Sequence, residues 1–226
     1  MRVLKASALA VALAVCTVAA QDTDRKVAGG GITAKGWTGK IDAASAKKGA
    51  TINDSKVMDM AGGLHLQVGP AATYWNPANT ATGDYTVRAT FKESKVTSDH
   101  PHPYGLFIGG NDMGTDQQSY LYCSAYGSGK FIVRGFGPEP FQMNARGEEN
   151  AAVNKAAGQN QPVTQQIAIS VKPDKVECAI NGTTVASYDK SALVAAGKLK
   201  STDGVYGIRF AHNTDGVVTG LTKTTP

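Results

Sequence analysis

The stretch Asp-Tyr-Thr-Val-Arg-Ala-Thr-Phe-Lys, residues 84–92, decides the fold class of this chain. Apolar side chains occupy every second position from Tyr85 to Phe91, and more polar side chains occupy the positions between them. A repeat of two places alternate side chains on opposite faces of an extended chain, so the stretch predicts a β-strand with one buried face. Residues 166–172 repeat the pattern.

The chain continues in the same way on both sides of these strands. Residues 175–188 contain two alternating runs separated by Asn181-Gly182, and this dipeptide favours a type I′ hairpin turn, in which both central residues have positive φ. Clusters of Gly, Pro, Asn and Asp punctuate the remainder, and only residues 191–197 have a helical pattern. This organisation predicts an all-β chain, a two-sheet antiparallel β-sandwich with one short helix. Further strands are expected at residues 62–68, 72–75, 104–109, 118–126, 130–136, 204–211 and 217–222.

Residues 1–20 have the pattern of a secretory signal peptide. Arg2 and Lys5 precede an apolar run at residues 7–15 that is too short to span a bilayer. Small residues precede Gln21, so we expect cleavage before it. The alternative is a lipoprotein anchor on Cys16, but the valine before that cysteine fits a lipidation site poorly. The expected location is therefore secreted or periplasmic, without a transmembrane segment.

The mature chain is expected to hold one domain, residues 37–226, preceded by a Gly-rich flexible tether at residues 21–36. Without the signal peptide, 21 Lys and Arg stand against 18 Asp and Glu, so the formal charge falls from +5 to +3. This mild excess is spread along the chain. Nucleic-acid binding, which requires a concentrated basic stripe, is not expected.

Cys123 and Cys178 are the two cysteines that remain after removal of the signal peptide. An even pair in an oxidising compartment favours a disulfide. Both fall within predicted strands, so those strands must be neighbours or face each other across the core. The alternative is two separate buried thiols, which pack as small hydrophobes.

Several segments, taken in order, resemble the concanavalin-A-like, laminin-G-like jelly-roll superfamily of secreted bacterial proteins, near the 3-keto-disaccharide hydrolase-like domains. The resemblance covers about residues 37–222. It implies a jelly-roll sandwich and a function in binding carbohydrate or acting on glycosides. The segments that carry it are Gly-Gly-Leu-His-Leu (62–66), Gly-Pro-Ala-Ala-Thr-Tyr-Trp-Asn-Pro-Ala (69–78), Gly-Asp-Tyr-Thr-Val (83–87), Tyr-Gly-Leu-Phe-Ile-Gly-Gly-Asn-Asp (104–112), Gln-Ser-Tyr-Leu-Tyr (118–122), Val-Glu-Cys-Ala-Ile-Asn-Gly-Thr (176–183) and Gly-Val-Tyr-Gly-Ile-Arg-Phe-Ala-His-Asn (204–213).

Enzymatic activity is left open. A retaining glycosidase needs two carboxyl groups about 5–5.5 Å apart, and family 16 glycosidases supply theirs from a Glu-x-Asp-x-Glu strand. No such strand occurs here, so family 16 chemistry is not expected, and the alternative is a carboxyl pair assembled from distant loops. The catalytic residues stay unassigned. The glutamates are Glu93, Glu139, Glu148, Glu149 and Glu177.

The predicted strand at 118–126 offers a candidate binding surface. Tyr120, Tyr122 and Tyr126 share one face, and Leu121 and Cys123 lie on the other. If the small apolar face packs inward, the tyrosines face outward and could stack on sugar rings. If the tyrosines face inward, they are core residues whose hydroxyl groups need partners.

Polar strand positions add to this surface. Arg134 and Arg209 each oppose apolar neighbours, so both could line one polar sheet face beside the tyrosines. Sugar sites combine a flat aromatic side chain with forked donors such as arginine. The candidate ligand-binding residues are Trp75, Tyr120, Tyr122, Arg134, Arg209 and His212. The alternative is an ordinary solvated face.

Two segments are weak metal candidates, and we expect no cofactor from either. Two rings at His100 and His102 could chelate Zn²⁺ or Cu²⁺, but a metal site usually has three or four ligands, and the favoured interpretation is a Pro-stiffened surface loop. Asp112 and Asp116 could bind Ca²⁺, as laminin-G-like domains often do, but the favoured interpretation is a hairpin connection in which they supply turn geometry.

Three functions follow in order of preference. The first is a carbohydrate-binding module, and the second is a hydrolase of the 3-keto-disaccharide hydrolase-like type. The third is a structural or protein-interaction domain, with the polar insertion at residues 137–162 as the partner contact. Only the last predicts an exposed apolar patch.

Overall fold

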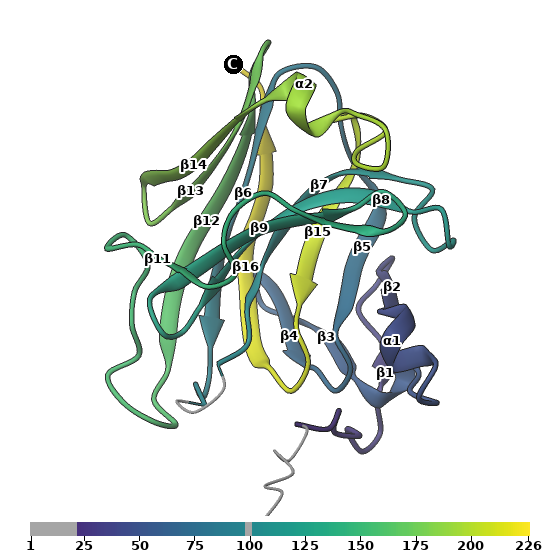
Figure 1. Ribbon diagram of the computed structural model, residues 1–226. Coiled ribbons are helices and arrows are strands. Elements are labelled where there is room, and N and C mark those ends of the chain that lie inside the picture. Colours follow the sequence, from purple (N-terminus) through teal and green to yellow (C-terminus); the bar gives the residue numbers. More distant parts are fainter. Residues whose placement is uncertain (1–21, 98–100) are drawn as a thin grey trace, which may run out of the picture.

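The structure, a computed structural model, describes residues 22–97 and 101–226, and its strands form two sheets packed face to face (Figure 1). The predicted signal peptide lies outside the described residues. The first sheet, sheet A, has the strand order β1 (Gly31–Ile32), β3 (Lys56–Met60), β4 (Gly63–Gln67), β16 (Asp215–Thr224), β6 (Tyr85–Glu93), β12 (Val163–Val171), β13 (Lys175–Ile180) and β14 (Thr183–Asp189).

The second sheet, sheet B, carries the candidate site. Its order is β10 (Pro140–Gln142), β9 (Lys130–Phe136), β8 (Ser119–Tyr126), β7 (Tyr104–Asn111), β15 (Gly204–Phe210), β5 (Ala72–Ala81) and β2 (Thr38–Ile41), and β11 (Glu148–Glu149) also pairs with β9. All strand pairs are antiparallel except β1 with β3. The predicted all-β jelly-roll sandwich is confirmed.

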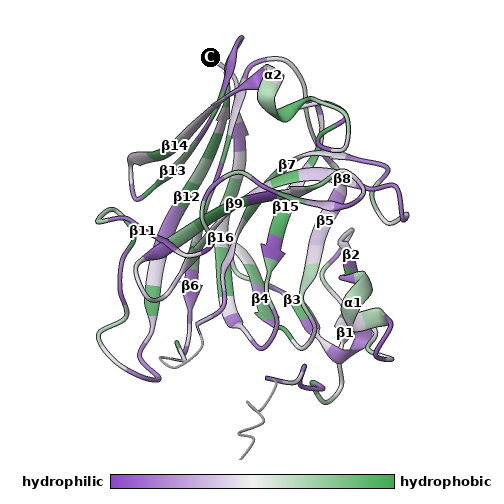
Figure 2. Cartoon of the chain, viewed as in Figure 1, coloured by the Kyte–Doolittle hydropathy of each residue, from purple (hydrophilic) through white to green (hydrophobic). Residues whose placement is uncertain are grey.

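Strand β6 shows why the sequence folds this way. Val87 and Phe91 are buried in the core, whereas Arg88 and Lys92 on the opposite face are exposed. Its neighbour β12 repeats the alternation, and Figure 2 shows the change between hydrophobic and hydrophilic residues along that strand. Burial of one face of each strand against the other sheet forms the core, as the period of two predicts.

The hairpin between β13 and β14 forms at the predicted turn. Asn181 and Gly182 have φ values of 50° and 85°, the left-handed pair that a type I′ turn requires. The Asn181 side chain also donates to the carbonyl of Ala152 and accepts from the amide of Gln166, at 2.8 and 2.7 Å. Through these hydrogen bonds, Asn181 also holds part of the 137–162 insertion against the sheet.

That insertion is more ordered than a free loop. Strands β10 and β11 both pair with β9 and extend the edge of sheet B. The helical segment is shorter than predicted, because α2 spans only Lys190–Leu193. The other short helices are α1 (Ala43–Ala46) and the 3₁₀ turn η1 (Ile52–Asp54). No helix in the described part of the chain is long and apolar enough to cross a membrane.

The segment expected to be a flexible tether is instead packed against the sandwich. Arg25 pairs with Asp215, and its Nε donates to the carbonyl of Val68 at 3.0 Å. The amide of Val27 donates to the carbonyl of Asp54 at 3.0 Å, and Ala34 is buried. The glycines at 29–31 thus serve turn geometry and a short strand rather than flexibility, because this segment finds specific partners far along the chain.

A disulfide joins Cys123 of β8 to Cys178 of β13, with their Cα atoms 6.1 Å apart. The two strands belong to different sheets. Of the two arrangements that the sequence allowed, the structure has the one in which the strands face each other across the core.

Candidate functional site

A cavity of about 170 Å³ opens on the face of sheet B that points away from the core, here called the outer face. Its wall consists of residues from β8, β9 and β15, from the segments next to β2, β5, β7 and β15, and from the insertion between β10 and β11. The lining residues are Asp42, Ala71, His102, Pro103, Tyr122, Ser124, Tyr126, Ile132, Arg134, Arg146, Arg209, Ala211 and His212.

Alternation along β8 explains which side chains reach this cavity. Leu121 and Cys123 pack into the core, so Tyr122 and Tyr126 face outward. Register then sets their neighbours, because Tyr122 lies opposite Arg134 on β9. The interpretation in which the small apolar face packs inward is therefore the one that the structure has.

Arg209 is the most firmly held side chain of the cavity. Its Nη1 lies 2.9 Å from Asp42 Oδ1 and 3.0 Å from the hydroxyl of Thr73. Its guanidinium carbon lies 5.1 Å from the centre of the Tyr122 ring, a distance at which a cation attracts an aromatic face. Burial opposes the charged form, but the Asp42 carboxylate holds the pKa of Arg209 well above its usual value. The residue stays charged and rigid.

Aromatic residues pack beneath the cavity and form its floor. Tyr120 is fully buried, its ring centre lies 5.3 Å from that of Phe107 and 5.1 Å from that of Phe136, and its hydroxyl bonds to Thr73 at 2.9 Å. Trp75 belongs to the same cluster and is 6% exposed. Of the six candidate binding residues, Tyr122, Arg134, Arg209 and His212 line the cavity, whereas Tyr120 and Trp75 pack behind it.

Two further arginines give the cavity its positive character. Arg146 is exposed at the rim, and Arg134 has a buried Nε with no hydrogen-bond partner. Neither pairs with a carboxylate among the described residues. Because Asp42 already compensates Arg209, the cavity arginines without a carboxylate partner are Arg134 and Arg146. They suit hydroxyl, ring-oxygen or carboxylate acceptors.

Two histidines stand side by side at one edge of the cavity. The ring centres of His102 and His212 are 4.0 Å apart. His102 Nε2 lies 2.8 Å from Asp22 Oδ2, and His212 Nδ1 lies 2.9 Å from Asp24 Oδ1. The hydrogen bond from His102 lowers the pKa of Asp22. Both acids come from the segment expected to be a tether.

The structure changes both metal-site hypotheses that were made from the sequence. His102 lies in the loop segment before β7, as expected, but its side chain is buried and its neighbour is His212, which sequence spacing did not bring near it. His100 lies outside the described residues. The Asp112 carboxylate pairs with Lys200, and that of Asp116 pairs with Lys40 at 3.0 Å, so these two acids are held by separate lysines.

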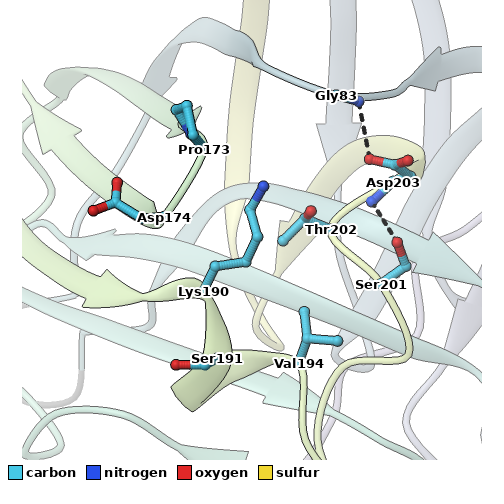
Figure 3. A pocket seen from close by; sticks show the side chains of 9 residues that line it. All are labelled: Gly83, Pro173, Asp174, Lys190, Ser191, Val194, Ser201, Thr202 and Asp203. Atoms are coloured by element: carbon cyan, nitrogen blue, oxygen red, sulfur yellow. Dashed lines mark hydrogen bonds between the residues drawn. The ribbon is translucent and has the colours of Figure 1, made fainter.

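A larger but shallow hollow of about 630 Å³ lies beside α2 (Figure 3). Lys190 reaches into it between Asp174 and Thr202, and the nearby Asp203 carboxylate accepts from the amide of Gly83 at 3.0 Å. Its wall contains no aromatic side chain. The smaller cavity on sheet B, with rigid aromatic and forked donor groups, is the better candidate for ligand recognition.

Sequence reasoning missed Asp22, Asp24, Asp42 and Arg146. The first two lie in a segment without periodicity, and the arginine lies in the long insertion. The signal that could have drawn attention to Asp42 is the buried Arg209, since a buried charge needs a partner. Nothing in the sequence says which acid supplies it.

Comparison with solved structures identifies the fold. The chain is similar to carbohydrate-binding module CBM66 from Bacillus subtilis, with a TM-score of 0.55 and 10% identity, over 86% of this chain and 99% of that chain. A galectin-like protein from Bacillus subtilis has a TM-score of 0.49 and 14% identity, over 84% and 89%. A glycosyl hydrolase-type protein from Parabacteroides distasonis has 0.49 and 11%, over 84% and 99%. Neither a protein-family model nor a curated protein matches the sequence. The likeness to the carbohydrate-binding module shows that the two chains share a β-sandwich fold.

Proposed function

We propose that the protein is a carbohydrate-binding module that holds one sugar unit, or the end of a glycan, in the cavity on the outer face of sheet B. The observation that carries the proposal is the convergence of Tyr122, Arg134, Arg209 and His212 on one cavity from three separate parts of the chain. An aromatic face beside fixed donors is the combination that sugar rings require.

The size and chemistry of the cavity limit the ligand. Its volume of about 170 Å³ is below the roughly 300–1,000 Å³ of pockets for drug-sized molecules, which suits a single ring. The arginines favour a sugar derivative rich in acceptor oxygens. The likeness in fold to a carbohydrate-binding module agrees with this proposal.

We also propose that the protein acts outside the cytoplasm, after removal of residues 1–20. The basic start, the apolar run and the small residues before Gln21 support this. The amino-terminal sequence of the protein recovered from the extracytoplasmic fraction tests it. A chain that begins at Gln21 is expected, and a lipid-modified Cys16 would contradict it.

A thermal-shift screen against mono- and oligosaccharides, followed by titration calorimetry of the hits, tests the binding proposal. A ligand at a hundredfold excess over Kd adds about 2.7 kcal/mol of apparent stability. Tyr122→Ala and Arg134→Ala are expected to weaken binding about tenfold or more, as truncation of a central contact does. Arg88→Ala, on the exposed face of sheet A, is the matched control.

The screen can also overturn the proposal. Absence of a shift with every sugar class, neutral and acidic, would do so, as would binding that Tyr122→Ala and Arg134→Ala leave unchanged. The remaining hypothesis, a protein-interaction domain, has little support, because Met60 and Val194 are the only large hydrophobic residues with exposed side chains in the described parts. They form no apolar patch that would mark a partner site.

The second candidate function is hydrolysis of a glycoside. It is favoured by the Asp22–His102 pair, whose 2.8 Å contact at the edge of the cavity provides a carboxylate and an imidazole beside a bound sugar. Release of chromophore from aryl glycosides, measured with the native protein and with His102→Ala, tests it. Activity that His102→Ala leaves intact would exclude this pair as the source.

A further inference from the structure

One group of side chains in the described residues can hold a metal ion. Asp22, His102 and His212 each offer a ligand atom, and these three atoms lie within 4.8 Å of one another. We propose that they form a binding site for a divalent transition-metal ion of the Zn²⁺ class. This inference does not depend on the proposed binding of carbohydrate.

The strand register brings the two histidines together. Phe210 of β15 pairs with Tyr104 of β7, and the amide of Ala211 donates to the carbonyl of Pro103 at 2.9 Å. The antiparallel ladder therefore places His212, two residues after Phe210, opposite His102, two residues before Tyr104. Both histidines lie just beyond the ends of the paired strands, next to the hydrogen bond between Ala211 and Pro103, which limits where their backbones can lie.

Asp22 is fixed by contacts along a different part of the chain. Its Oδ1 accepts from Asn213 Nδ2 at 3.0 Å, and its Oδ2 contacts His102. Asn213 also binds the carbonyl of Thr23 at 2.9 Å and accepts from the amide of Arg25 at 2.9 Å. The hydrogen bond from Asn213 therefore holds the carboxylate beside the histidines and can stay when a metal ion binds, whereas the ion would replace the contact between Asp22 and His102.

The donor set selects the class of metal. Two imidazoles and one carboxylate suit Zn²⁺ and its neighbours in the first transition row, whereas Ca²⁺ and Mg²⁺ prefer oxygen donors alone. Ligands about 2.1 Å from a tetrahedral zinc lie roughly 3.4 Å apart. Atoms already within 4.8 Å reach that spacing through small side-chain rotations.

The carboxylate of Asp24 orients one of the two histidines. Metal-binding histidines usually donate their other ring nitrogen to a carboxylate or carbonyl, which fixes the tautomer. Asp24 Oδ1 lies 2.9 Å from His212 Nδ1. When Nδ1 carries the proton, Nε2 keeps its lone pair for the ion. Asp24 is thus a positioning residue for His212.

The site would face the cavity. His102 and His212 both line it, and three protein ligands leave a fourth tetrahedral position open to water or to an oxygen of a bound molecule. A metal ion there would add a second positive centre for the oxygen atoms of a ligand, besides the arginines that also line the cavity. Closed structural zinc sites, in contrast, have four protein ligands.

Titration calorimetry of the protein without a polyhistidine tag, stripped with EDTA and dialysed, tests the site with Zn²⁺ alone. One ion per chain is expected. Asp22→Asn and His102→Ala are expected to weaken binding at least about tenfold, since even outer hydrogen-bond partners alter metal affinity by 10- to 100-fold. His65→Ala, in β4 of sheet A, is the matched control and should bind as the native protein does.

A second readout separates this site from adventitious binding. Co²⁺ in place of Zn²⁺ is expected to give an intense visible spectrum of four-coordinate type, lost in His212→Gln and retained in His65→Ala. Asp22 is exposed, so Asp22→Asn keeps the fold even if a histidine variant does not. Zn²⁺ binding that is absent from the native protein, or unchanged in Asp22→Asn and His102→Ala, would overturn the proposal. Sugar binding measured in EDTA then tests the carbohydrate proposal separately.

Discussion

At the scale of single residues, Arg209 and Glu93 are both buried ionisable groups, and they differ in whether a partner stabilises the buried charge. Arg209 is 7% exposed and is held by both oxygens of Asp42. Glu93 is 4% exposed, and its Oε2 has no hydrogen-bond partner in the described structure. Substitution of Asp42 should therefore lower the stability of the fold, whereas substitution of Glu93 by a neutral residue should raise it.

Asp42→Asn is expected to destabilise the protein by about 3 kcal/mol, because it leaves the Arg209 charge buried without a counter-ion. Urea unfolding at neutral pH measures the loss. Asp116→Asn is the control, because that carboxylate pairs with Lys40 while its side chain is 98% exposed, and exposed pairs contribute little. Equal losses of stability in the two variants would show that the Arg209–Asp42 ion pair contributes no more than the exposed Lys40–Asp116 pair.

Glu93 gives the protein a dependence on pH. Burial, with a smaller contribution from the charge of Asp215, raises the pKa of Glu93 from 4.5 to about 8. The unfolded chain therefore loses this proton at a lower pH than the folded chain does. The stability that the protonated form contributes is full below pH 4.5 and is lost as the pH rises toward 8.

Glu93→Gln should remove this loss and raise the free energy of unfolding at pH 9 by a few kcal/mol, on the order of 1.4 kcal/mol for each unit of the pKa difference. Unfolding curves from pH 4 to pH 9 measure it. Glu139→Gln, at an exposed position, should leave the pH profile unchanged. A parallel profile for native protein and Glu93→Gln would refute the raised pKa.

At the scale of elements, local periodicity predicted the long strands, and it failed where the structure depends on distant partners. Strand β6 spans Tyr85–Glu93 and β9 spans Lys130–Phe136, close to the expected ranges. The short strands β2 and β3 were missed, since neither has a sustained alternation. Their pairing comes from neighbouring strands in the sheet rather than from their own sequence.

The β13–β14 hairpin permits a direct test of its turn. Gly182→Ala is expected to cost about 1 kcal/mol, because φ is 85° and a side chain is strained there. Thermal unfolding measures the change. Gly158→Ala is the control, because an added Cβ would meet only Gln161, at 3.9 Å. An unchanged unfolding temperature for Gly182→Ala would mean that the turn accommodates the added side chain without strain.

At the scale of the whole molecule, the disulfide is the covalent link between the two sheets. Cys123 and Cys178 are 55 residues apart in sequence, so the chain-entropy model predicts a contribution of about 4 kcal/mol. The double variant Cys123→Ala/Cys178→Ala should lose about that amount in denaturant unfolding. Reductant should lower the stability of the native protein and leave the double variant unchanged. An identical midpoint for native and variant would show that the link adds nothing.

The candidate site is also a property of the whole molecule, which is why sequence analysis predicted only part of it. The tyrosine and arginine positions on β8, β9 and β15 could be predicted, because alternation assigns each side chain to a face. Asp22 and Asp42 could not, because their roles depend on contacts with residues 80 or more positions away. Such pairings have no local signature.

Those contacts between residues 22–25 and 212–215 bear on the time at which the cavity edge takes shape during synthesis. The ribosome must synthesise the chain through residue 212 before His212 can contact Asp24 or His102. A partly synthesised chain therefore has its early strands but neither the paired imidazoles nor their acids. This edge of the cavity therefore forms late, after the strands that precede residue 212 have been synthesised.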